Sequence, residues 1–296
     1  AATDMKTSQT PLPPPPPTLP LSVPLYRQSC EVRAHDVKPQ TSVQEVLERQ
    51  LHRITAGSEE AAVVSRVLPL RPVLQDGPQC GLVALSMASQ LLQDHPVSVQ
   101  ALFETAKSLQ FTKKGEMFSV ENMKTLAEAC LQGSLTKIVH SEHRLHIVRH
   151  LLEGKPVLIP YDSDGNFEPC LKNGHTAHWA VLHGICLVVH QSSCIEGMLA
   201  NVSEVDSKCS SIFHIRNEMP EEVLIKFTQL VESQETGAFV YASQGKSRHV
   251  GLWELELLLK SNKNLAHFTP KRDISEFVIP EGGVAGGLSG QVLFFT

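Results

Sequence analysis

The sequence contains no apolar run that could cross a membrane, because a spanning helix needs about 18 consecutive apolar residues and no window approaches that length. It also lacks an N-terminal basic stretch followed by an apolar one, the pattern of a secretory signal peptide. The 26 Lys and Arg residues are outnumbered by 31 Asp and Glu residues, and a net charge of −5 excludes a strongly basic nucleic-acid clamp. These absences predict a soluble, cytoplasmic protein that binds neither nucleic acid nor membranes.

Cysteine is sparse and shows no pairing pattern. The seven cysteines are odd in number, widely spread, and nowhere form a CxxC pair. This distribution argues against a disulfide framework and against a Cys-rich zinc module, and it fits a reducing compartment. In such a compartment a single cysteine in an unusual context is a candidate nucleophile.

Histidine offers the alternative of a metal site. Four of the 14 histidines lie in the segment HSEHRLHIVRH, at His140, His143, His146 and His150. The last two have the i,i+4 spacing of one helix face, but the segment lacks the glutamate of an HExxH motif and has no partnering Cys pair. We therefore favour an exposed histidine-rich face over a zinc site, and we expect no metal or organic cofactor.

Proline marks the first boundary in the chain. Eight of the 19 prolines lie between Pro11 and Pro24, and five of them are consecutive, from Pro13 to Pro17. Such a run forms a polyproline II rod without a core, so residues 1–24 are predicted to be a disordered, proline-rich arm. The arm is either a stiff tether or a ligand for an aromatic groove of the SH3, WW or profilin type.

The rest of the chain is predicted to form a linker with one peripheral helix over residues 25–64, followed by one domain over residues 65–296. Helical periodicity of about 3.6 residues occurs in several segments, at 42–54, 81–92, 97–109, 120–131, 142–152 and 252–259. Runs with strand character occur mostly later, at 156–160, 178–189, 237–242, 276–279 and 291–295. This segregation predicts an α+β fold with an antiparallel sheet, because a parallel sheet needs a crossover helix between successive strands.

Two further segments are predicted to be loops. The Ser-rich stretch 191–211 reads as an insertion between two strands. The glycines between Gly282 and Gly290 fail the P-loop pattern, since no Lys-Ser/Thr follows them, and we expect them to form tight turns between the last two strands.

Cys80 is the candidate nucleophile. Gly77 and Pro78 predict a turn, after which Cys80 and Gly81 open an apolar helix. The N-terminus of a helix favours a thiolate and lowers its pKa, and its unpaired N–H groups can stabilise an oxyanion. A buried structural cysteine is the alternative, but the turn, the helix and the flanking glutamines favour catalysis. We further expect the small Gly81 to leave room for a substrate carbonyl.

His178 is the candidate base. It opens the apolar strand that begins in GHTAHWAV, so it is held by the sheet and faces a cleft. Successive side chains of a strand alternate between its two faces, which places His178 and His183 on opposite faces. His175 lies in the preceding loop and is a weaker candidate. Most of the other histidines are expected to be ordinary surface or core residues.

The supporting roles are assigned to glutamines. Gln244 ends the next strand with a polar exit, where its amide oxygen could accept a hydrogen bond from the imidazole, although a neutral amide stabilises an imidazolium less than Asp would. Gln75 is predicted to add a side-chain donor to the Cys80 N–H in an oxyanion hole. Gln79 is the second choice, because it adjoins Cys80 and can point elsewhere.

Together these motifs resemble papain-like cysteine peptidases of the C39-like type. More closely, the sequence from Leu74 to the C-terminus resembles the actin maturation protease family in its segments GPQCGLVAL, GEMFSV, LIPYD, EPC, GHTAHWAV, QGKS and GGVAGGLSGQ. The resemblance implies a papain-like fold, catalysis by Cys80 and His178, and removal of the acetylated Cys or Met from the N-terminus of immature actin. It also implies that the proline-rich arm binds profilin.

The N-terminus of actin is acidic, so a matching cleft needs local cations. Lys172, His175 and Lys246 flank the motif segments and are the candidates for substrate binding, with Lys113 and Lys114 in reserve. The alternative is that each is an ordinary solvated charge.

Two other functions remain open from the sequence. One is a non-enzymatic adaptor, in which the proline-rich arm recruits a partner and the peptidase fold is inactive. The other is a thiol transferase or deamidase, because an acyl-enzyme formed on Cys80 can be resolved by an amine or can arise from an amide substrate.

Overall fold

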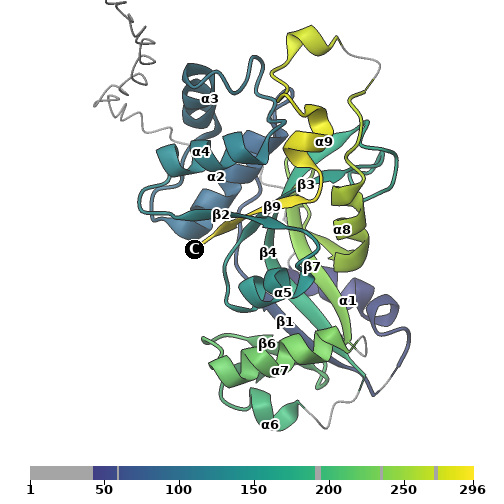
Figure 1. Ribbon diagram of the computed structural model, residues 1–296. Coiled ribbons are helices and arrows are strands. Elements are labelled where there is room, and N and C mark those ends of the chain that lie inside the picture. The colour runs from purple at the N-terminus through teal and green to yellow at the C-terminus, as the bar shows by residue number, and fades with distance from the viewer. Residues whose placement is uncertain (1–42, 59, 191–194, 234–235, 270–272) are drawn as a thin grey trace, which may run out of the picture. The chain divides into compact units, whose positions relative to one another are not determined.

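The computed structural model describes residues 43–296 except for residues 59, 191–194, 234–235 and 270–272 (Figure 1). The predicted proline-rich arm over residues 1–24 lies outside the described residues. Within the described part of the chain, no helix is long and apolar enough to cross a membrane.

One nine-stranded sheet forms the centre of the fold (Figure 1). Its strands are β1 (Ala62–Val67), β2 (Thr136–His140), β3 (Val157–Asp162), β4 (Ala177–Val189), β5 (Ser203–Val205), β6 (Ile212–Ile215), β7 (Thr236–Gln244), β8 (Gly251–Glu254) and β9 (Gln291–Phe295). The strand order is β2-β9-β3-β4-β1-β6-β5, and β7 pairs with both β4 and β8. The pairing is antiparallel as predicted, except that β1 and β6 are parallel.

Helices cover both faces of this sheet. They are α1 (Val43–Ile54), α2 (Cys80–Leu92), α3 (Val99–Ser108), α4 (Val120–Cys130), α5 (Arg144–Leu152), α6 (Glu196–Leu199), α7 (Glu221–Glu232), α8 (Leu255–Lys263) and α9 (Gly283–Leu288). The predicted α+β class, with helices early in the chain, is confirmed, because α2, α3 and α4 all precede β2.

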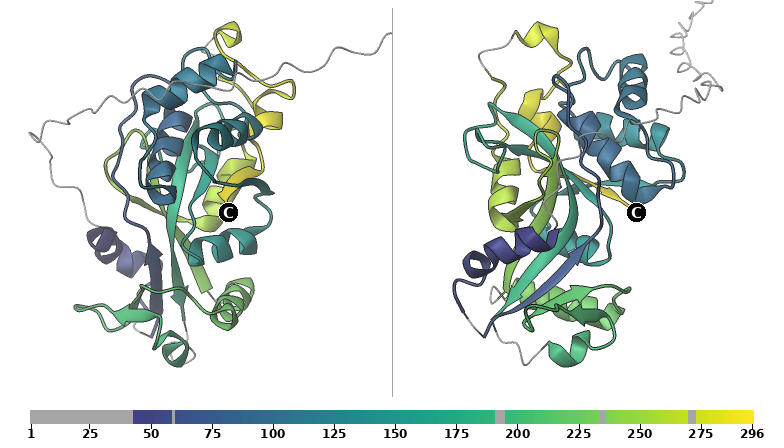
Figure 2. Two further views of the ribbon diagram at one scale, coloured as in Figure 1. Left: turned by 90° about the vertical axis from the view of Figure 1, so that its left-hand side faces the viewer. Right: turned by 180° about the vertical axis from the view of Figure 1, so that it is seen from behind.

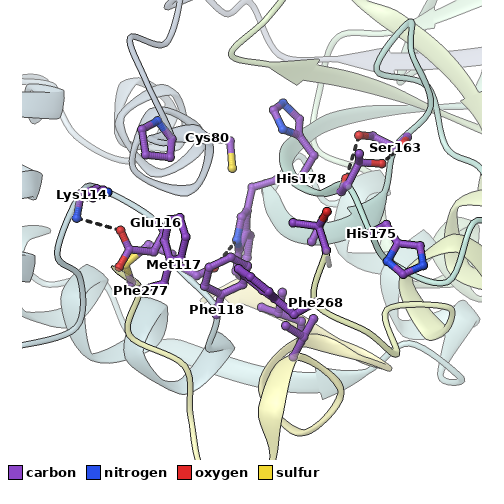
Figure 3. A pocket seen from close by; sticks show the side chains of 18 of the residues that line it. Cys80, Lys114, Glu116, Met117, Phe118, Ser163, His175, His178, Phe268 and Phe277 are labelled. Carbon is purple, nitrogen blue, oxygen red and sulfur yellow. Dashed lines mark hydrogen bonds between the residues drawn. The ribbon is translucent and has the colours of Figure 1, made fainter. Parts of the chain in front are cut away.

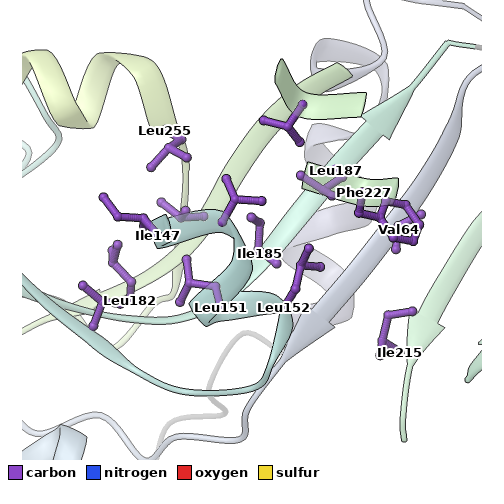
Figure 4. Close-up of a cluster of buried hydrophobic side chains, with 14 of the residues drawn as sticks. Val64, Ile147, Leu151, Leu152, Leu182, Ile185, Leu187, Ile215, Phe227 and Leu255 are labelled. Carbon is purple, nitrogen blue, oxygen red and sulfur yellow. The ribbon is translucent and has the colours of Figure 1, made fainter. Parts of the chain in front are cut away.

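The long strand β4 connects the three hydrophobic clusters of the core. Trp179 and Val181 pack with α2, α3 and α4 on one face. Ala180 and Leu182 pack with α5 and α8 on the other face, in the cluster shown in Figure 4. The site described below lies at the β4 end that α2 covers.

A β-bulge then changes which residues of β4 face each side. Leu182 pairs with Ala242 and Gly184 with Tyr241, so His183 is an extra residue on β4. Beyond it, odd-numbered residues such as Leu187 face α7 while even-numbered ones face α1, which therefore lies on the opposite face (Figure 2). The simple alternation predicted for 178–189 holds only as far as the bulge.

Several predicted boundaries differ from the observed ones. The predicted domain start at residue 65 falls inside β1, a full member of the sheet, and the predicted peripheral helix is α1, which packs on that sheet. Part of the predicted insertion loop 191–211 forms α6 and β5, and β5 pairs with β6. The helix predicted over 252–259 begins at Leu255, because residues 251–254 pair with β7 as β8.

Two predictions near the C-terminus are wrong. Residues 276–279 do not form a strand, because the N–H of Val278 donates to the carboxylate of Glu116 instead of to a neighbouring strand. A short 3-10 helix, η2, covers Ile274–Glu276 just before it. The glycines expected to form tight turns instead form α9 and the ends that flank it.

Candidate active site

Cys80 is the first residue of α2. Gly77 adopts φ +66°, a conformation that favours glycine, and the chain then passes through Pro78 into the helix. Gln79 precedes the helix and makes no side-chain capping bond, so it does not occupy the N–H groups of the first turn. Residues 81–89 of the helix are all buried, so this part of α2 is covered on every side.

Gly81 has a packing role rather than the predicted one. A Cβ atom at this position would lie 2.8 Å from Met123 Cε and 3.0 Å from Met117 Cβ. The missing side chain therefore makes room for two methionines of the protein, not for a substrate carbonyl.

The thiol of Cys80 lies in a desolvated position, although the residue is only partly buried and borders the cleft. Burial raises the pKa of Cys80 to about 11, although hydrogen bonds from the backbone N–H groups of Trp179 and Gly81 act to lower it. The expected lowering of this pKa by the helix N-terminus is therefore wrong, because desolvation outweighs it. In the free protein the thiol carries its proton at neutral pH.

His178 lies at the start of β4, opposite Tyr161 of β3. Its Nε2 lies 3.3 Å from Oε1 of Gln244, the last residue of β7. Burial lowers the pKa of His178 to about 4, with Lys246 adding a smaller lowering and the bond to Gln244 opposing it. The imidazole is therefore neutral at neutral pH and available as a base.

Gln244 also determines which nitrogen of His178 acts. The backbone N–H of Lys246 donates to Gln244 Oε1 at 2.6 Å, which identifies this atom as the amide oxygen. Because an amide oxygen only accepts, His178 Nε2 must carry the proton, and the lone pair resides on Nδ1. The predicted orienting residue is thus in contact with the predicted base.

Two aromatic side chains border the imidazole. The Tyr161 ring meets it edge-on at 5.9 Å, and the Phe167 ring lies at 5.5 Å between centroids. These contacts and the strand pairing restrict the rotation of His178.

Gln75 is better placed than Gln79 for the oxyanion role. It lines the cleft next to Cys80. Its backbone N–H donates to Gly245 O at 2.8 Å, and its Nε2 donates to Gly77 O at 2.7 Å. That bond uses one of the two N–H groups of Nε2 and leaves the other for a ligand. Gln79 instead packs against Gly115, where a Cβ atom would lie 2.5 Å from its Cγ.

A cleft of about 720 Å³ contains these groups. Figure 3 shows Cys80 at its upper wall, with the sulfur directed down into the cleft and the His178 side chain beside it on the right. Lys114, Glu116, Met117 and Phe277 lie on one side, and Ser163 and His175 lie on the other (Figure 3). Both candidate catalytic residues thus open onto one cleft, although 98 positions separate them in the sequence.

The predicted cations divide into two groups. Lys246 and His175 line the cleft, and the His175 ring stacks near that of His267 at 6.3 Å. Lys172 does not belong to the described cleft lining; its backbone N–H donates to the carboxylate of Asp162. Lys114 lines the cleft but is paired with Glu276 at 3.0 Å.

The histidine-rich segment shows no metal-binding geometry. Among the described residues, no group of three or more His, Cys, Asp or Glu side chains could hold a metal ion. His140, His143 and His146 are exposed, as expected, but His150 is buried and stacks on Phe294 with ring centroids 4.2 Å apart.

Sequence comparisons place the chain in a family. A family model described as "Actin maturation protease-like, C-terminal domain" matches residues 70–186. The protein named "Actin maturation protease" of Danio rerio is 39% identical over 236 residues, which cover 75% of this chain and 70% of that protein. This chain belongs to the actin maturation protease family. The namesakes from Mus musculus and Homo sapiens are 40% and 38% identical, over 74% and 77% of this chain and 60% and 64% of their own lengths.

No solved structure matches this chain. The match to the actin maturation protease-like family model includes Gln75, Cys80 and His178 but ends before Gln244 and Lys246. The aromatic wall of the cleft, formed by Phe118, Phe268 and Phe277, was not predicted. These residues come from separate segments and show no periodicity, so only the GEMFSV motif, which contains Phe118, gave any signal for them.

Proposed function

We propose that this protein is a cysteine-type aminopeptidase that removes the acetylated Cys or Met from the N-terminus of immature actin. The observation that carries the proposal is the juxtaposition of Cys80 and His178 in one cleft, with His178 held by Gln244. The names of the relatives support actin as the substrate. The described cysteines are free, which supports a cytoplasmic setting.

The reaction begins with attack on the carbonyl carbon of the first residue. As the sulfur of Cys80 forms its bond to that carbon, His178 Nδ1 takes the thiol proton, so charge develops only when the substrate is in place. The carbonyl oxygen becomes an oxyanion. It is held by the backbone N–H of Cys80 and the second N–H of Gln75 Nε2.

The intermediate then collapses with cleavage of the C–N bond. His178 returns its proton to the leaving amine, which becomes the new N-terminus of actin, and the acylated first residue stays on Cys80 as a thioester. A water molecule attacks this thioester while His178 takes its proton. The N-acetylated amino acid leaves and the thiol of Cys80 is restored.

The residues that follow the scissile bond in actin are acidic, and two candidate cations line the cleft. Lys246 lies close enough to both Cys80 and His178 to lower the pKa values of both groups. We assign Lys246 and His175 to binding of these acidic residues. Lys172, which does not border the cleft, is left with at most a peripheral role in substrate binding.

The proline-rich arm supplies the proposed partner contact. Residues 1–24 are proposed to bind profilin, because a polyproline II rod loses little entropy when it docks in an aromatic groove. Removal of residues 1–24 should weaken profilin binding and leave cleavage of a short peptide unchanged. A truncated protein that no longer cleaves the peptide would contradict this assignment.

The decisive experiment is mass spectrometry of an N-acetylated actin N-terminal peptide incubated with the protein. Wild type should release the acetylated first residue, and Cys80→Ala should reduce the rate by at least about a thousandfold. Cys170→Ala is the matched control, because Cys170 is a free, partly exposed cysteine that is not part of the described cleft lining.

The alternatives give different products in the same assay. A thiol transferase would join the acyl group to an added amine, and a deamidase would change a side-chain amide without shortening the peptide. Absence of any product, both from the peptide and from whole actin bound to profilin, would favour the adaptor function instead.

A further inference from the structure

The wall of the cleft on the Met117 side carries a cluster of apolar side chains next to Lys114 and Glu116. We call this wall the aromatic pocket, and its residues are Met117, Phe118, Phe268, Phe277, Val284 and Leu288. Its three rings are in mutual contact. The centroid of the Phe118 ring lies 5.5 Å from that of Phe268 and 6.1 Å from that of Phe277, and the Phe268 and Phe277 centroids are 5.6 Å apart. Three rings that contact one another at a cleft wall form a rigid apolar surface.

The aromatic pocket adjoins the nucleophile. Met117 packs against Gly81, the neighbour of Cys80, and its backbone oxygen accepts a hydrogen bond from Trp179 Nε1 at 2.9 Å. On the opposite side of the cleft, the Phe167 ring borders His178. Ser163 and His175 mark this side in Figure 3. Because His178 protonates the leaving amine, the amine departs on its side. The acyl residue therefore occupies the side of Met117.

A buried carboxylate fixes the shape of this pocket. Glu116 is only 3% exposed, and it accepts backbone N–H bonds from Lys113 at 2.9 Å, Lys114 at 2.8 Å and Val278 at 3.0 Å. The first two donors belong to its own loop. The third belongs to the segment 273–280, which carries Phe277. These bonds lower the pKa of Glu116, although burial alone would raise it.

Two lysines strengthen the same junction. Lys113 Nζ donates to Ser275 O at 2.6 Å, and Lys114 Nζ pairs with Glu276 at 3.0 Å. Lys114 also lies over the Phe277 ring, 5.7 Å from its centroid. The loop before α4 and the segment that carries Phe277 are therefore joined at several points. Of the three charged side chains at this junction, Glu116 is buried, whereas Lys113 and Lys114 are exposed.

Helix α9 closes the pocket from a third direction. A Cβ atom on Gly287 would lie 2.0 Å from Phe118 O, so the helix backbone rests directly on the Phe118 backbone. Val284 and Leu288 of the same helix are buried against the pocket. The aromatic pocket is thus bounded by the loop 113–118, the segment 273–280 and α9.

We propose that the aromatic pocket binds the side chain of the first substrate residue and selects it by size, and that Glu116 is the positioning residue that sets the width of the pocket. The inference rests on the proposed function for the identity of the substrate. A flexible apolar side chain such as Met fits between the rings, whereas a bulky aromatic one competes with them for the same space.

The first test enlarges the pocket. We expect Phe268→Ala to raise the ratio of kcat/KM for an N-acetyl-Trp peptide over that for an N-acetyl-Met peptide by at least about tenfold, with the rest of the peptide unchanged. Phe239→Ala is the matched control, because Phe239 is a partly buried residue of β7 in a different cluster and should leave the ratio unchanged. An unchanged ratio in Phe268→Ala would overturn the assignment of the pocket.

The second test concerns Glu116. Glu116→Gln replaces one acceptor oxygen with a donor that faces a backbone N–H, so we expect KM to rise about tenfold while kcat changes by less than about threefold. Glu121→Gln, at an exposed position of α4, is the control. Thermal unfolding verifies that the variant is folded. A fall in kcat with an unchanged KM would contradict the positioning role.

A labelling experiment separates this inference from the proposed function. The chloromethyl ketone of N-acetylmethionine should alkylate wild-type Cys80 about tenfold faster than that of N-acetyltryptophan, and Phe268→Ala should remove this preference. Glu116→Gln should slow the first reagent but not the small reagent iodoacetamide. A wild type that shows this labelling pattern but cleaves no peptide would refute the proposed function and support the pocket. Equal labelling by both ketones would overturn the pocket.

Discussion

The side-chain oxygen of Gln244 accepts from two donors at once, and this explains how a neutral residue can orient the proposed catalytic base. The N–H of Lys246 fixes the oxygen at 2.6 Å, and the oxygen then fixes the Nε2 proton of His178. An aspartate would hold the same proton and would also raise the pKa of the imidazole by its charge. The amide therefore orients the His178 ring without adding a negative charge beside it. This fits a free protein in which Cys80 is a thiol and the His178 imidazole is neutral.

Substitution of Gln244 separates these two effects. Gln244→Ala removes the acceptor, so kcat should fall by about 10- to 100-fold, less than for His178→Ala, which removes the base itself. Gln244→Glu keeps an acceptor and adds a negative charge, which raises the pKa of His178. Because the base must be neutral to act, the acid limb of the profile of kcat/KM against pH should move to higher pH. A loss in Gln244→Ala as deep as that in His178→Ala would show that Gln244 does more than orient the ring.

The pKa values of the resting pair predict the reactivity of Cys80. A thiol whose pKa is raised to about 11 is almost entirely protonated near neutral pH, and only the thiolate reacts with iodoacetamide. The alkylation rate should therefore rise about tenfold per pH unit from about pH 6 to about pH 9. Peptide mapping distinguishes Cys80 from the other free cysteines. A rate that is already constant at about pH 6 would indicate a preformed thiolate-imidazolium pair and contradict this prediction.

The residues proposed to do the chemistry could be named from the sequence, but their environment could not. Cys80 and His178 each stand in a short segment with a turn, a helix start or a strand start that the sequence displays. Burial is a property of the whole fold, so the direction of the Cys80 pKa was predicted wrongly. The rings of Phe268 and Phe277 meet Phe118 only because α8, α9 and the segments around them bring distant parts of the chain together.

Helix α9 shows how a glycine-rich segment can be mistaken for turns. Its sequence is GVAGGL, in which the three glycines and the valine have low or moderate helix propensity. The segment also shows no helical periodicity of apolar residues. The helix forms because its backbone packs directly against Phe118, where any side chain on Gly287 would collide. Tertiary contact, not local propensity, decides this element.

A matched pair of substitutions tests that explanation. Gly287→Ala places a Cβ atom 2.0 Å from Phe118 O and 2.6 Å from Pro280 Cγ, so it should destabilise the protein by about 1–3 kcal/mol. Gly286→Ala meets nothing within 4 Å, so its higher helix propensity should stabilise the protein by about 0.5–1 kcal/mol. Urea unfolding measures both changes. Equal effects of the two substitutions would contradict direct packing of α9 on the pocket wall.

Strand prediction succeeded for continuous apolar runs and failed where polar residues interrupt the run or the strand is very short. β3, β4, β7 and β9 all correspond to predicted runs. β1 was missed because Ser65 and Arg66 interrupt its apolar residues, and β6 has only four residues. Residues 276–279 have the composition of a strand, but the bond from Val278 to Glu116 takes the place of strand pairing.

Among the residues that the structure describes, three buried histidines affect stability in the same direction. Burial lowers the pKa values of His150, His178 and His183 from the ordinary value of 6.5 to about 4. Burial keeps His183 neutral even though its Nδ1–H donates to Leu68 O at 2.8 Å, a bond that acts to raise its pKa; Ser243 Oγ lies 3.1 Å from Nε2. The unfolded chain binds protons at these side chains at a pH where the folded chain does not.

Stability should therefore fall as the pH falls from about 6.5 towards about 4. Each histidine lowers the free energy of unfolding by up to about 1.4 kcal/mol per pH unit in this window, because the unfolded state gains a proton that the folded state lacks. Carboxylates with lowered pKa values, such as Glu116, add to the loss only below their ordinary value of 4.5. Urea unfolding at several pH values between about 7.5 and 5 thus isolates the histidines.

His150→Phe provides the control for this window. The ring at position 150 stacks on Phe294 at 4.2 Å between centroids, so a phenyl ring can keep that packing while it removes one titrating group. The dependence of the unfolding free energy on pH should then fall by about a third, because two of the three buried imidazoles remain. If the slope of the variant equals that of wild type, His150 does not contribute. If the wild type shows no slope at all between about pH 6.5 and 5, the imidazoles are protonated within the fold, and His178 would then no longer be a neutral base.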